Sequence, residues 1–354
     1  MAVAFNPAGA WTALVTPFDA RGKLNKEIFA RFCEFQSAEG ITGIVPAGTT
    51  GESPTLTWEE HNEVVEIAVQ VAGEKIGVLA GTGSNCTDEA VAATKHAREC
   101  GASAALLVDC YYNGPSSLEL RTEYYEKIIR WVPDLPLVPY IIPGRTGAAL
   151  SSEDLAILHL TFPKRVPAVK QATGDLERMR KERELCGAGF AIMSGDDDLT
   201  LPMMKDAKLG ASGVISVMTN VVPGAIAKMV AAQRAGDGAT AERISQQLQP
   251  IFSLVTFKLP GERVLPGGKT LTVEDRFRNP TPVKTMLAGL GVPVGPCRAP
   301  LGKMPKAAVE RCRAALQEVF RADPSHLTPL NKHFGVNVEK QLADDAAWAA
   351  VTRA

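Results

Sequence analysis

Two residues near the ends of neighbouring apolar runs have side chains suited to carbonyl chemistry. Lys170 closes the run Val166–Lys170, and Tyr140 lies in the preceding run Leu137–Ile142. If the runs are adjacent strands, burial disfavours the ammonium ion and lowers the lysine pKa. A neutral amine attacks a ketone to form a Schiff base, and a phenol beside it can move the protons. Taken singly, Lys170 fits a solvent-reaching lysine and Tyr140 a core aromatic, so the pair carries the prediction.

Three loop segments add groups that could bind a carboxylate or relay protons. Arg145 follows Tyr140 by five residues and offers the planar fork that matches a carboxylate, although alone it fits a surface charge. The segment Gly48–Glu52 combines small residues with two hydroxyls, so its backbone can approach an anion. Tyr111–Asn113 follows a later apolar run. An ordinary glycine-rich turn and a packed loop are the structural alternatives for the last two.

The sequence motifs that would indicate a nucleotide or metal site are incomplete. Gly81–Cys86 lacks the third glycine of a dinucleotide fingerprint, and Gly48–Gly51 lacks the lysine of a phosphate-binding P-loop. Five scattered histidines show no metal-ligand spacing. Asp196–Asp198 could hold a divalent cation, but we favour a role in capping the next helix, because no distant ligand accompanies the three acids.

The candidate reactive residues lie in or after short apolar runs of the chain. These runs alternate with amphipathic stretches. Such runs fit parallel strands covered on both faces. Helices are predicted between them, for example over Trp58–Val71 with Thr57 as N-cap and over Asp88–Cys100 with Thr87 as N-cap. Eight evenly spaced units favour a closed (β/α)8 TIM barrel over a doubly wound open sheet. The eight predicted strands are Trp11–Thr16, Gly43–Ala47, Ile76–Ala80, Ala104–Val108, Leu137–Ile142, Val166–Lys170, Phe190–Ser194 and Gly213–Val217.

The later part of the chain predicts a C-terminal helical domain after the barrel. We place the barrel at residues 1–235 and the helical domain at 236–322, with helices over Ala239–Phe257, Val283–Leu290 and Pro305–Phe320. Residues 259–280 break the helical pattern with Pro, Gly and charge, which indicates an inserted long loop or hairpin. Residues 323–354 form an extension, interpreted as an extra helix or a docking arm.

Composition narrows the class of protein. The net charge of −1 provides no basic field for phosphates, which argues against a nucleic-acid partner. No apolar run reaches the roughly 18 residues that a membrane span needs. Seven cysteines without a CxxC pair indicate reduced thiols, and no export signal is visible, so we expect a cytoplasmic globular protein.

Taken together, the motifs resemble the dihydrodipicolinate synthase / N-acetylneuraminate lyase family of class I pyruvate aldolases. The similarity spans about residues 10–305, with residues 259–278 and the tail after 321 outside the pattern. The matching motifs occur in the same order as in the family. They are GTTGE at 48–52, AGTGSN at 80–85, YYN at 111–113, YxxPxRT at 140–146, VKxATGD at 169–175, SGDD at 194–197 and GVISV at 213–217. Arg145 and the YYN element favour the dihydrodipicolinate synthase branch.

The resemblance implies roles for individual residues. Lys170 would form the Schiff base with pyruvate, Tyr140 would be the general acid/base, and Thr49 with Tyr112 would complete a proton relay. Tyr112 would reach in from the neighbouring subunit of a homotetramer, a dimer of dimers. Thr49 and Thr50 would hold the pyruvate carboxylate, Arg145 that of L-aspartate 4-semialdehyde, and Gly195 and Ile215 would line the pocket. The implied reaction is their aldol condensation to 4-hydroxy-tetrahydrodipicolinate, in lysine and diaminopimelate biosynthesis, with no metal or organic cofactor.

The resemblance also implies an inhibitory lysine site at a dimer interface, formed by Ser53, Trp58, His61, Asn85, Glu89 and Tyr111. Three positions depart from the family pattern. Ile141 stands where Asn is usual, Gln171 replaces Glu, and Asp109 places a carboxylate predicted to lie near the barrel mouth. These departures leave the imine chemistry intact but bear on the second substrate.

Three alternatives therefore remain open. A sugar-acid or 4-hydroxy-2-oxo-acid aldolase would keep the imine and change the aldehyde. A metal-dependent barrel aldolase would use Asp196–Asp198. A non-catalytic paralogue is disfavoured because the whole reactive set is present.

Overall fold

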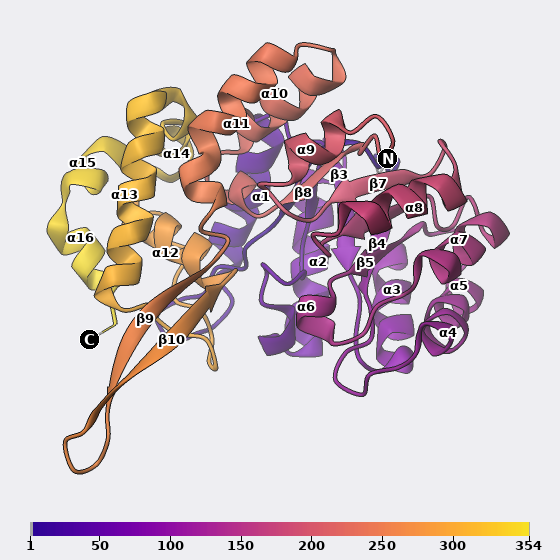
Figure 1. Ribbon diagram of the computed structural model, residues 1–354, viewed down its shortest axis with the longest axis horizontal. Coiled ribbons are helices and arrows are strands. Elements are labelled where there is room, and N and C mark those ends of the chain that lie inside the picture. The colour runs from indigo at the N-terminus through magenta and orange to yellow at the C-terminus, as the bar shows by residue number, and fades with distance from the viewer. Residues whose placement is uncertain (1–2, 354) are drawn as a thin grey trace.

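The computed structural model describes residues 3–353 and contains a closed barrel of eight parallel strands in chain order. Figure 1 shows the barrel surrounded by helices, with the C-terminal helices packed on one side. This confirms the predicted (β/α)8 barrel followed by a helical region. The strands are β1 Gly9–Ala13, β2 Gly43–Val45, β3 Gly77–Gly81, β4 Ala104–Val108, β5 Leu137–Ile141, β6 Ala168–Gln171, β7 Ala191–Ser194 and β8 Gly213–Ser216.

The strand predictions agree with the structure to within a few residues, and β1 begins two residues earlier than expected, at Gly9. Barrel closure comes from pairing of β1 with β8, in which Gly9 lies opposite Gly213. A methyl group on Gly213 would lie 1.9 Å from the carbonyl oxygen of Gly9, so this closure requires glycine.

Two helix caps were predicted from the local sequence, and the structure confirms one of them. Thr57 caps α2 through a capping box with Glu60, as predicted. The prediction of Thr87 as the cap of α3 is wrong. Cys86 occupies the N-cap, and the Thr87 hydroxyl instead donates to the Glu123 carbonyl. The barrel helices are α1 Lys26–Ala38, α2 Trp58–Ala72, α3 Thr87–Cys100, α4 Ser117–Glu119, a π-helix at Leu120–Tyr125, α5 Glu126–Trp131, α6 Pro143–Thr146, α7 Ser152–Thr161, α8 Leu176–Cys186, α9 Thr200–Lys205 and α10 Pro223–Arg234.

Successive side chains of each barrel strand point alternately into the barrel and outward, which gives two buried layers. Side chains that point into the barrel form one cluster, which includes Trp11, Tyr140 and Ile215. Their neighbours in sequence point outward and pack under the helices, as Ile141 and Val169 do. This period of two decides which residues can face the reaction site and which can only support it.

The C-terminal helices pack on the barrel through one continuous apolar cluster. That cluster contains Phe32 of α1, Met286 of α12 and Leu330 and Trp348 of the tail. A buried ion pair also joins the two parts, with Lys284 Nζ 2.6 Å from the Glu52 carboxylate. These helices are α11 Gly238–Phe252, α12 Thr281–Gly289, α13 Lys306–Ala322, α14 Pro329–Phe334, α15 Val338–Ala343 and α16 Asp345–Ala350.

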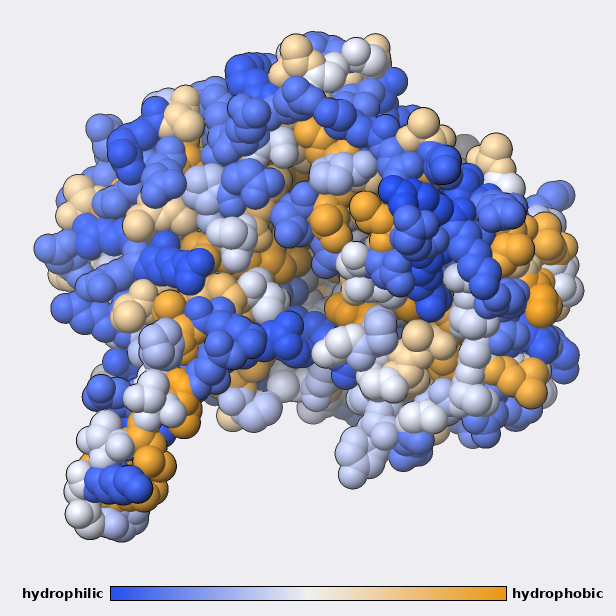
Figure 2. Space-filling model, in the orientation of Figure 1, coloured by the Kyte–Doolittle hydropathy of each residue, from blue (hydrophilic) through white to orange (hydrophobic). Residues whose placement is uncertain are grey.

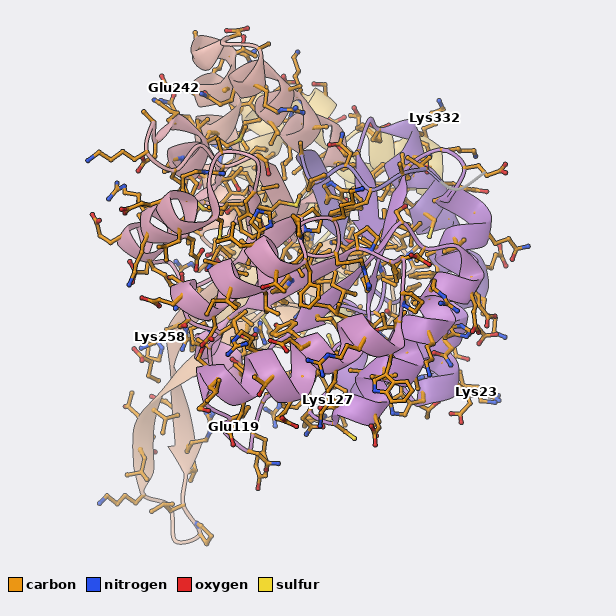
Figure 3. All side chains as sticks on the ribbon, turned by 90° about the vertical axis from the view of Figure 1, so that its right-hand side faces the viewer. Lys23, Glu119, Lys127, Glu242, Lys258 and Lys332 are labelled. Atoms are coloured by element: carbon orange, nitrogen blue, oxygen red, sulfur yellow. The ribbon has the colours of Figure 1, made fainter. Side chains whose placement is uncertain are left out.

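The inserted segment forms a hairpin rather than an irregular loop. Strands β9 Thr256–Val264 and β10 Thr270–Arg278 pair in antiparallel register along their whole length. Figure 3, where Lys258 marks its base, shows the hairpin standing clear of the barrel. The tail is helical and packs on α13 and α1, while the domain boundaries at 235 and 322 remain predictions.

Candidate active site

The paired strands β5 and β6 bring the predicted reactive pair together inside the barrel. Tyr140 and Lys170 lie directly opposite each other in the strand register. The Lys170 Nζ atom lies 4.2 Å from the centre of the Tyr140 ring, and both side chains are buried. A lysine amine and a phenol in contact inside a barrel mouth are the groups that imine formation and its proton transfers need.

Burial tunes both groups for this chemistry. Loss of hydration lowers the pKa of Lys170 to about 8, and the Asp196 and Asp197 carboxylates oppose that shift. Desolvation also raises the pKa of Tyr140 to about 12, against the influence of Arg145. A lysine with a pKa near 8 is partly a neutral amine in mildly alkaline solution, and the phenol stays protonated there, ready to donate.

A cavity of about 200 Å³ extends from Tyr140, the partner of Lys170, to the loops after β2, β3 and β4. Its wall includes Thr49, Tyr140 and Arg145, all predicted from the sequence, together with Gly81 and Gly83. The glycines are needed for space, because a methyl group on Gly83 would lie 2.6 Å from the Val108 amide nitrogen. The volume suits a small organic acid rather than a nucleotide.

The remaining predicted substrate residues lie close to the same centre. Thr50 is buried, and its hydroxyl accepts a hydrogen bond of 2.9 Å from Asn279 Nδ2. Gly195 packs directly on the reactive lysine, since a methyl group there would lie 3.2 Å from Lys170 Cε. Ile215 belongs to the inner barrel cluster with Tyr140.

Arg145 lies in α6 at the cavity wall, and part of its side chain remains exposed to solvent. Its Nη2 atom donates to the carbonyl oxygen of Asn279 at 2.8 Å. Burial lowers its pKa, and Arg278 and Arg276 add to that shift through repulsion. Because a guanidinium remains charged even so, Arg145 is a fixed cation facing the cavity.

Tyr112 does not join the reactive pair within this chain. Its side chain is 90% exposed, and its backbone φ of 74° is unusual for a residue other than glycine. The side chain therefore projects from the protomer, and any catalytic contact must come through a second copy.

The residues assigned to a lysine site do not all line one pocket of this chain. Ser53 and Tyr111 line the cavity, and Tyr111 and Asn85 line a second, more open pocket. The rings of Trp58 and His61 contact each other in a tilted arrangement with their centres 4.9 Å apart, and burial lowers the pKa of His61 to about 4. Glu89 accepts a hydrogen bond from Ser84.

The sequence departures at 141 and 171 lie on the outward face of their strands. Ile141 packs in the layer under the helices. Gln171 Nε2 donates to both carboxylate oxygens of Glu182, at 2.6 and 2.7 Å, and Arg178 donates to the same carboxylate. Burial raises the pKa of Glu182 to about 7, although Arg178 opposes the rise. Neither residue lines the cavity, so neither side chain contacts a ligand there directly.

Two expectations about acidic residues are wrong. Asp109 is not at the mouth, since its buried carboxylate accepts hydrogen bonds from Tyr125 Oη and the Leu150 amide in the outer layer. The acids at 196–198 do not cap the next helix either, because Leu199 occupies the N-cap of α9. Asp197 instead accepts bonds from Ser216 Oγ and the amides of Val217 and Met218, which fixes the turn after β8.

The sequence analysis considered Asp196 only as a cation ligand or a helix cap, whereas in the structure its carboxylate lies within electrostatic range of the reactive pair. Its carboxylate is half-buried, and desolvation raises its pKa to about 6, with Asp198 adding to the rise and Lys170 opposing it. It acts electrostatically on both Lys170 and Tyr140. The sequence does contain a clue to this position, because Asp196 follows Gly195 at the end of β7 and active sites lie at the carboxyl ends of barrel strands.

Over residues 3–353, the three side chains that could together hold a metal ion are Glu66, His96 and Cys100. They lie on α2 and α3, and none lines the cavity. The predicted absence of a metal cofactor remains a prediction. No helix in the same range is both long and apolar enough to cross a membrane.

Comparison with known proteins agrees with this geometry. The family model described as "Dihydrodipicolinate synthetase family" matches residues 6–319. The chain belongs to this family. The match includes every residue of the reactive set described above.

Individual members of the dihydrodipicolinate synthetase family are similar over most of the chain. The 4-hydroxy-tetrahydrodipicolinate synthase of Syntrophobacter fumaroxidans is 39% identical over 310 residues, which cover 87% of this chain and 97% of that protein. The enzyme of the same name from Nitratidesulfovibrio vulgaris strain DP4 is 41% identical over 283 residues, covering 80% and 88%. The crystal structure of dihydrodipicolinate synthase from Aquifex aeolicus matches with a TM-score of 0.77 and 36% identity, over 90% of this chain and 99% of that one.

Proposed function

We propose that this protein is a 4-hydroxy-tetrahydrodipicolinate synthase, which condenses pyruvate with L-aspartate 4-semialdehyde. The contact between the Lys170 amine and the ring of Tyr140, which lines a cavity together with Thr49 and Arg145, carries the proposal. The relatives of that name support it. The outward placement of Ile141 and Gln171 removes the sequence reason for preferring another aldehyde.

The proposed reaction begins at Lys170. The neutral amine adds to the keto carbon of pyruvate, Tyr140 supplies the proton that lets the hydroxyl leave as water, and an imine remains. Loss of a methyl proton converts the imine to an enamine. Its carbon bonds to the aldehyde carbon, and the resulting alkoxide takes up a proton. Attack of the substrate amine on the imine then frees Lys170 and closes the product ring.

Binding roles within this scheme follow the family resemblance. Thr49 and Thr50 would hold the carboxylate of pyruvate, and Arg145 would hold that of the aldehyde. Tyr112 would complete the proton relay from a second subunit, which its exposure favours. We therefore propose an oligomer, a homotetramer by resemblance, with no metal or organic cofactor. Seven free cysteines support a reducing, cytoplasmic location.

Turnover and chemical trapping test the proposed reaction together. Purified enzyme is assayed with both substrates, coupled to NADPH oxidation by dihydrodipicolinate reductase. It is also treated with borohydride in the presence of pyruvate, and the modified peptide is identified by mass spectrometry. We expect turnover and modification at Lys170, and Lys170→Ala should lose both. Trapping without turnover would keep the imine and favour a sugar acid or 4-hydroxy-2-oxo acid as the partner.

Lysine inhibition is a separate proposal for the cluster around Trp58 and His61. A similar structure, dihydrodipicolinate synthase from Cyanidioschyzon merolae, is described "with lysine bound". Activity is titrated with L-lysine, and Trp58→Ala is compared at matched turnover. An unchanged rate at millimolar lysine would contradict a lysine site here.

A further inference from the structure

A second cavity, of about 740 Å³, adjoins the reaction cavity and opens outward from it. The two share Thr49, Pro54 and Arg145 in their walls. The outer wall comes from the end of the inserted hairpin, from residues 300–304 and from Arg353. Arg353 lies beyond the family match at 319, so this vestibule is built partly from segments outside the family pattern.

The wall of this vestibule is strongly basic. Its cationic side chains are Arg145, Arg276, Arg278, Lys303 and Arg353. Its acidic side chain within residues 3–353 is Glu52, whose fully buried carboxylate accepts hydrogen bonds from Lys284 Nζ at 2.6 Å and the Arg298 amide at 2.8 Å. Glu52 is therefore already neutralised, and the vestibule carries a net positive charge.

The hairpin base is fixed against the substrate-binding residues. Arg278 Nη1 donates to the Gly144 carbonyl at 3.0 Å, beside Arg145. The next residue, Asn279, accepts from Arg145 through its carbonyl and donates to Thr50 through its side chain. Asn279 Oδ1 is buried without a hydrogen-bond partner in the described structure, which leaves a polar atom free in this wall. Figure 2 shows hydrophilic residues at the hairpin base beside a hollow in the surface.

Arg276 and Arg278 lie two positions apart on β10, so both project from the same face of the hairpin. The described structure gives the Arg276 side chain no ion pair or hydrogen bond, although Glu274 on that face is paired with Lys258. Three guanidinium groups near one opening repel one another, and the Arg145 pKa is lowered in part by the other two. A bound anion would relieve that repulsion.

We propose that the hairpin base makes this vestibule an anion-binding entrance that collects small carboxylates, with pyruvate as the first occupant, and delivers them to Lys170. The inference rests on the proposed function, because it takes pyruvate as the anion that must reach the lysine. A cleft lined by one sign of charge raises the local concentration of the opposite ion and its association rate. The base of the hairpin would thereby help the enzyme to capture its substrate.

The test is the ionic-strength dependence of pyruvate capture in Arg276→Gln. Arg276 is exposed, so its replacement leaves the core intact. We expect kcat/KM for pyruvate, or the borohydride-trapping rate where no aldehyde is turned over, to fall about threefold to tenfold at low salt. The saturated rate should stay unchanged, and the salt dependence should flatten. Arg276→Lys keeps the charge and should restore most of the lost rate.

Lys269→Gln is the matched control, because it removes the same charge from the same hairpin. Lys269 lies seven residues from Arg276 along the hairpin. At about 3.3 Å per residue this is roughly 23 Å, beyond the Debye length at physiological salt. The control should behave as the unmodified enzyme.

The two possible failures are distinguishable. If the unmodified enzyme shows no trapping of pyruvate at Lys170, the proposed function fails. If trapping occurs but Arg276→Gln and Lys269→Gln respond to salt identically, the reaction stands and the vestibule proposal is overturned.

Discussion

Two pairs of strands in this molecule have opposite physical settings. The pair β5–β6 lies in a closed barrel, where Tyr140 and Lys170 meet with 6% and 5% of their surfaces exposed. The pair β9–β10 stands outside the body, with Val264 69% exposed at its far end. A closed barrel has no free edge, whereas a two-stranded hairpin has two.

The difference teaches where each kind of chemistry can be placed. The barrel pair removes an amine from water and so changes its pKa, which a solvated hairpin cannot do. The hairpin instead presents charge, as in the ion pair between Arg263 and Asp275, at 2.6 Å. Charges and Pro260 along its edges also discourage pairing with other chains. The barrel therefore suits bond making, and the hairpin suits charge at the entrance.

The largest expected effect within the barrel, after loss of the lysine, is that of Tyr140→Phe. The change removes the proton donor and keeps the ring against Lys170. We expect kcat to fall about 10²- to 10⁴-fold, the range for loss of a general acid. Steady-state kinetics measure it, with circular dichroism as the control for folding. Retention of more than a tenth of the activity would mean that another group moves the proton.

Packing at the barrel floor gives the next prediction. A methyl group on Gly43 would lie 2.2 Å from the Trp11 ring and 2.6 Å from the Gly77 carbonyl oxygen. Gly43→Ala should lower the free energy of unfolding by about 1–3 kcal/mol, the usual cost of overpacking. Urea denaturation measures it. Gly189→Ala, where a methyl group meets nothing within 4 Å, is the matched control and should be nearly neutral.

The pH dependence of imine formation tests the electrostatics of the barrel pair. Burial lowers the pKa of Lys170 from 10.5 to about 8, so the amine is mostly protonated below that pH. The rate with subsaturating pyruvate should therefore rise about tenfold per pH unit below 8 and level off above it. Borohydride trapping at constant ionic strength gives the profile. A rate that still rises steeply above pH 10 would show that the lysine is not desolvated.

The smallest expected effect belongs to the hairpin. Leu271 is 36% exposed near its far end, so Leu271→Thr removes little packing within one chain. We expect a change in the free energy of unfolding within about 0.5 kcal/mol. Denaturation at two protein concentrations measures it. A loss above about 1.5 kcal/mol that depends on concentration would show that another subunit covers this strand.

Much of the fold and the reactive centre follows from local sequence. The apolar runs predicted eight strands because both faces of a parallel barrel strand are buried, so the signal is continuous. Lys170 and Tyr140 were identified because they lie at the ends of consecutive runs. Helix ends were less well predicted, since Cys86 rather than Thr87 caps α3, and no side chain caps α9.

The sequence by itself determined the strand order, the reactive pair and the presence of an inserted segment, because each depends on neighbours in the chain. Only the tertiary structure decided that Asp109 is buried under the helices and that Asp196 lies within electrostatic range of the lysine. It also brought Asn279 to Arg145 across 134 residues and Lys284 to Glu52 across 232. Such contacts leave no local pattern, because they depend on how the completed barrel packs against the later helices and the hairpin.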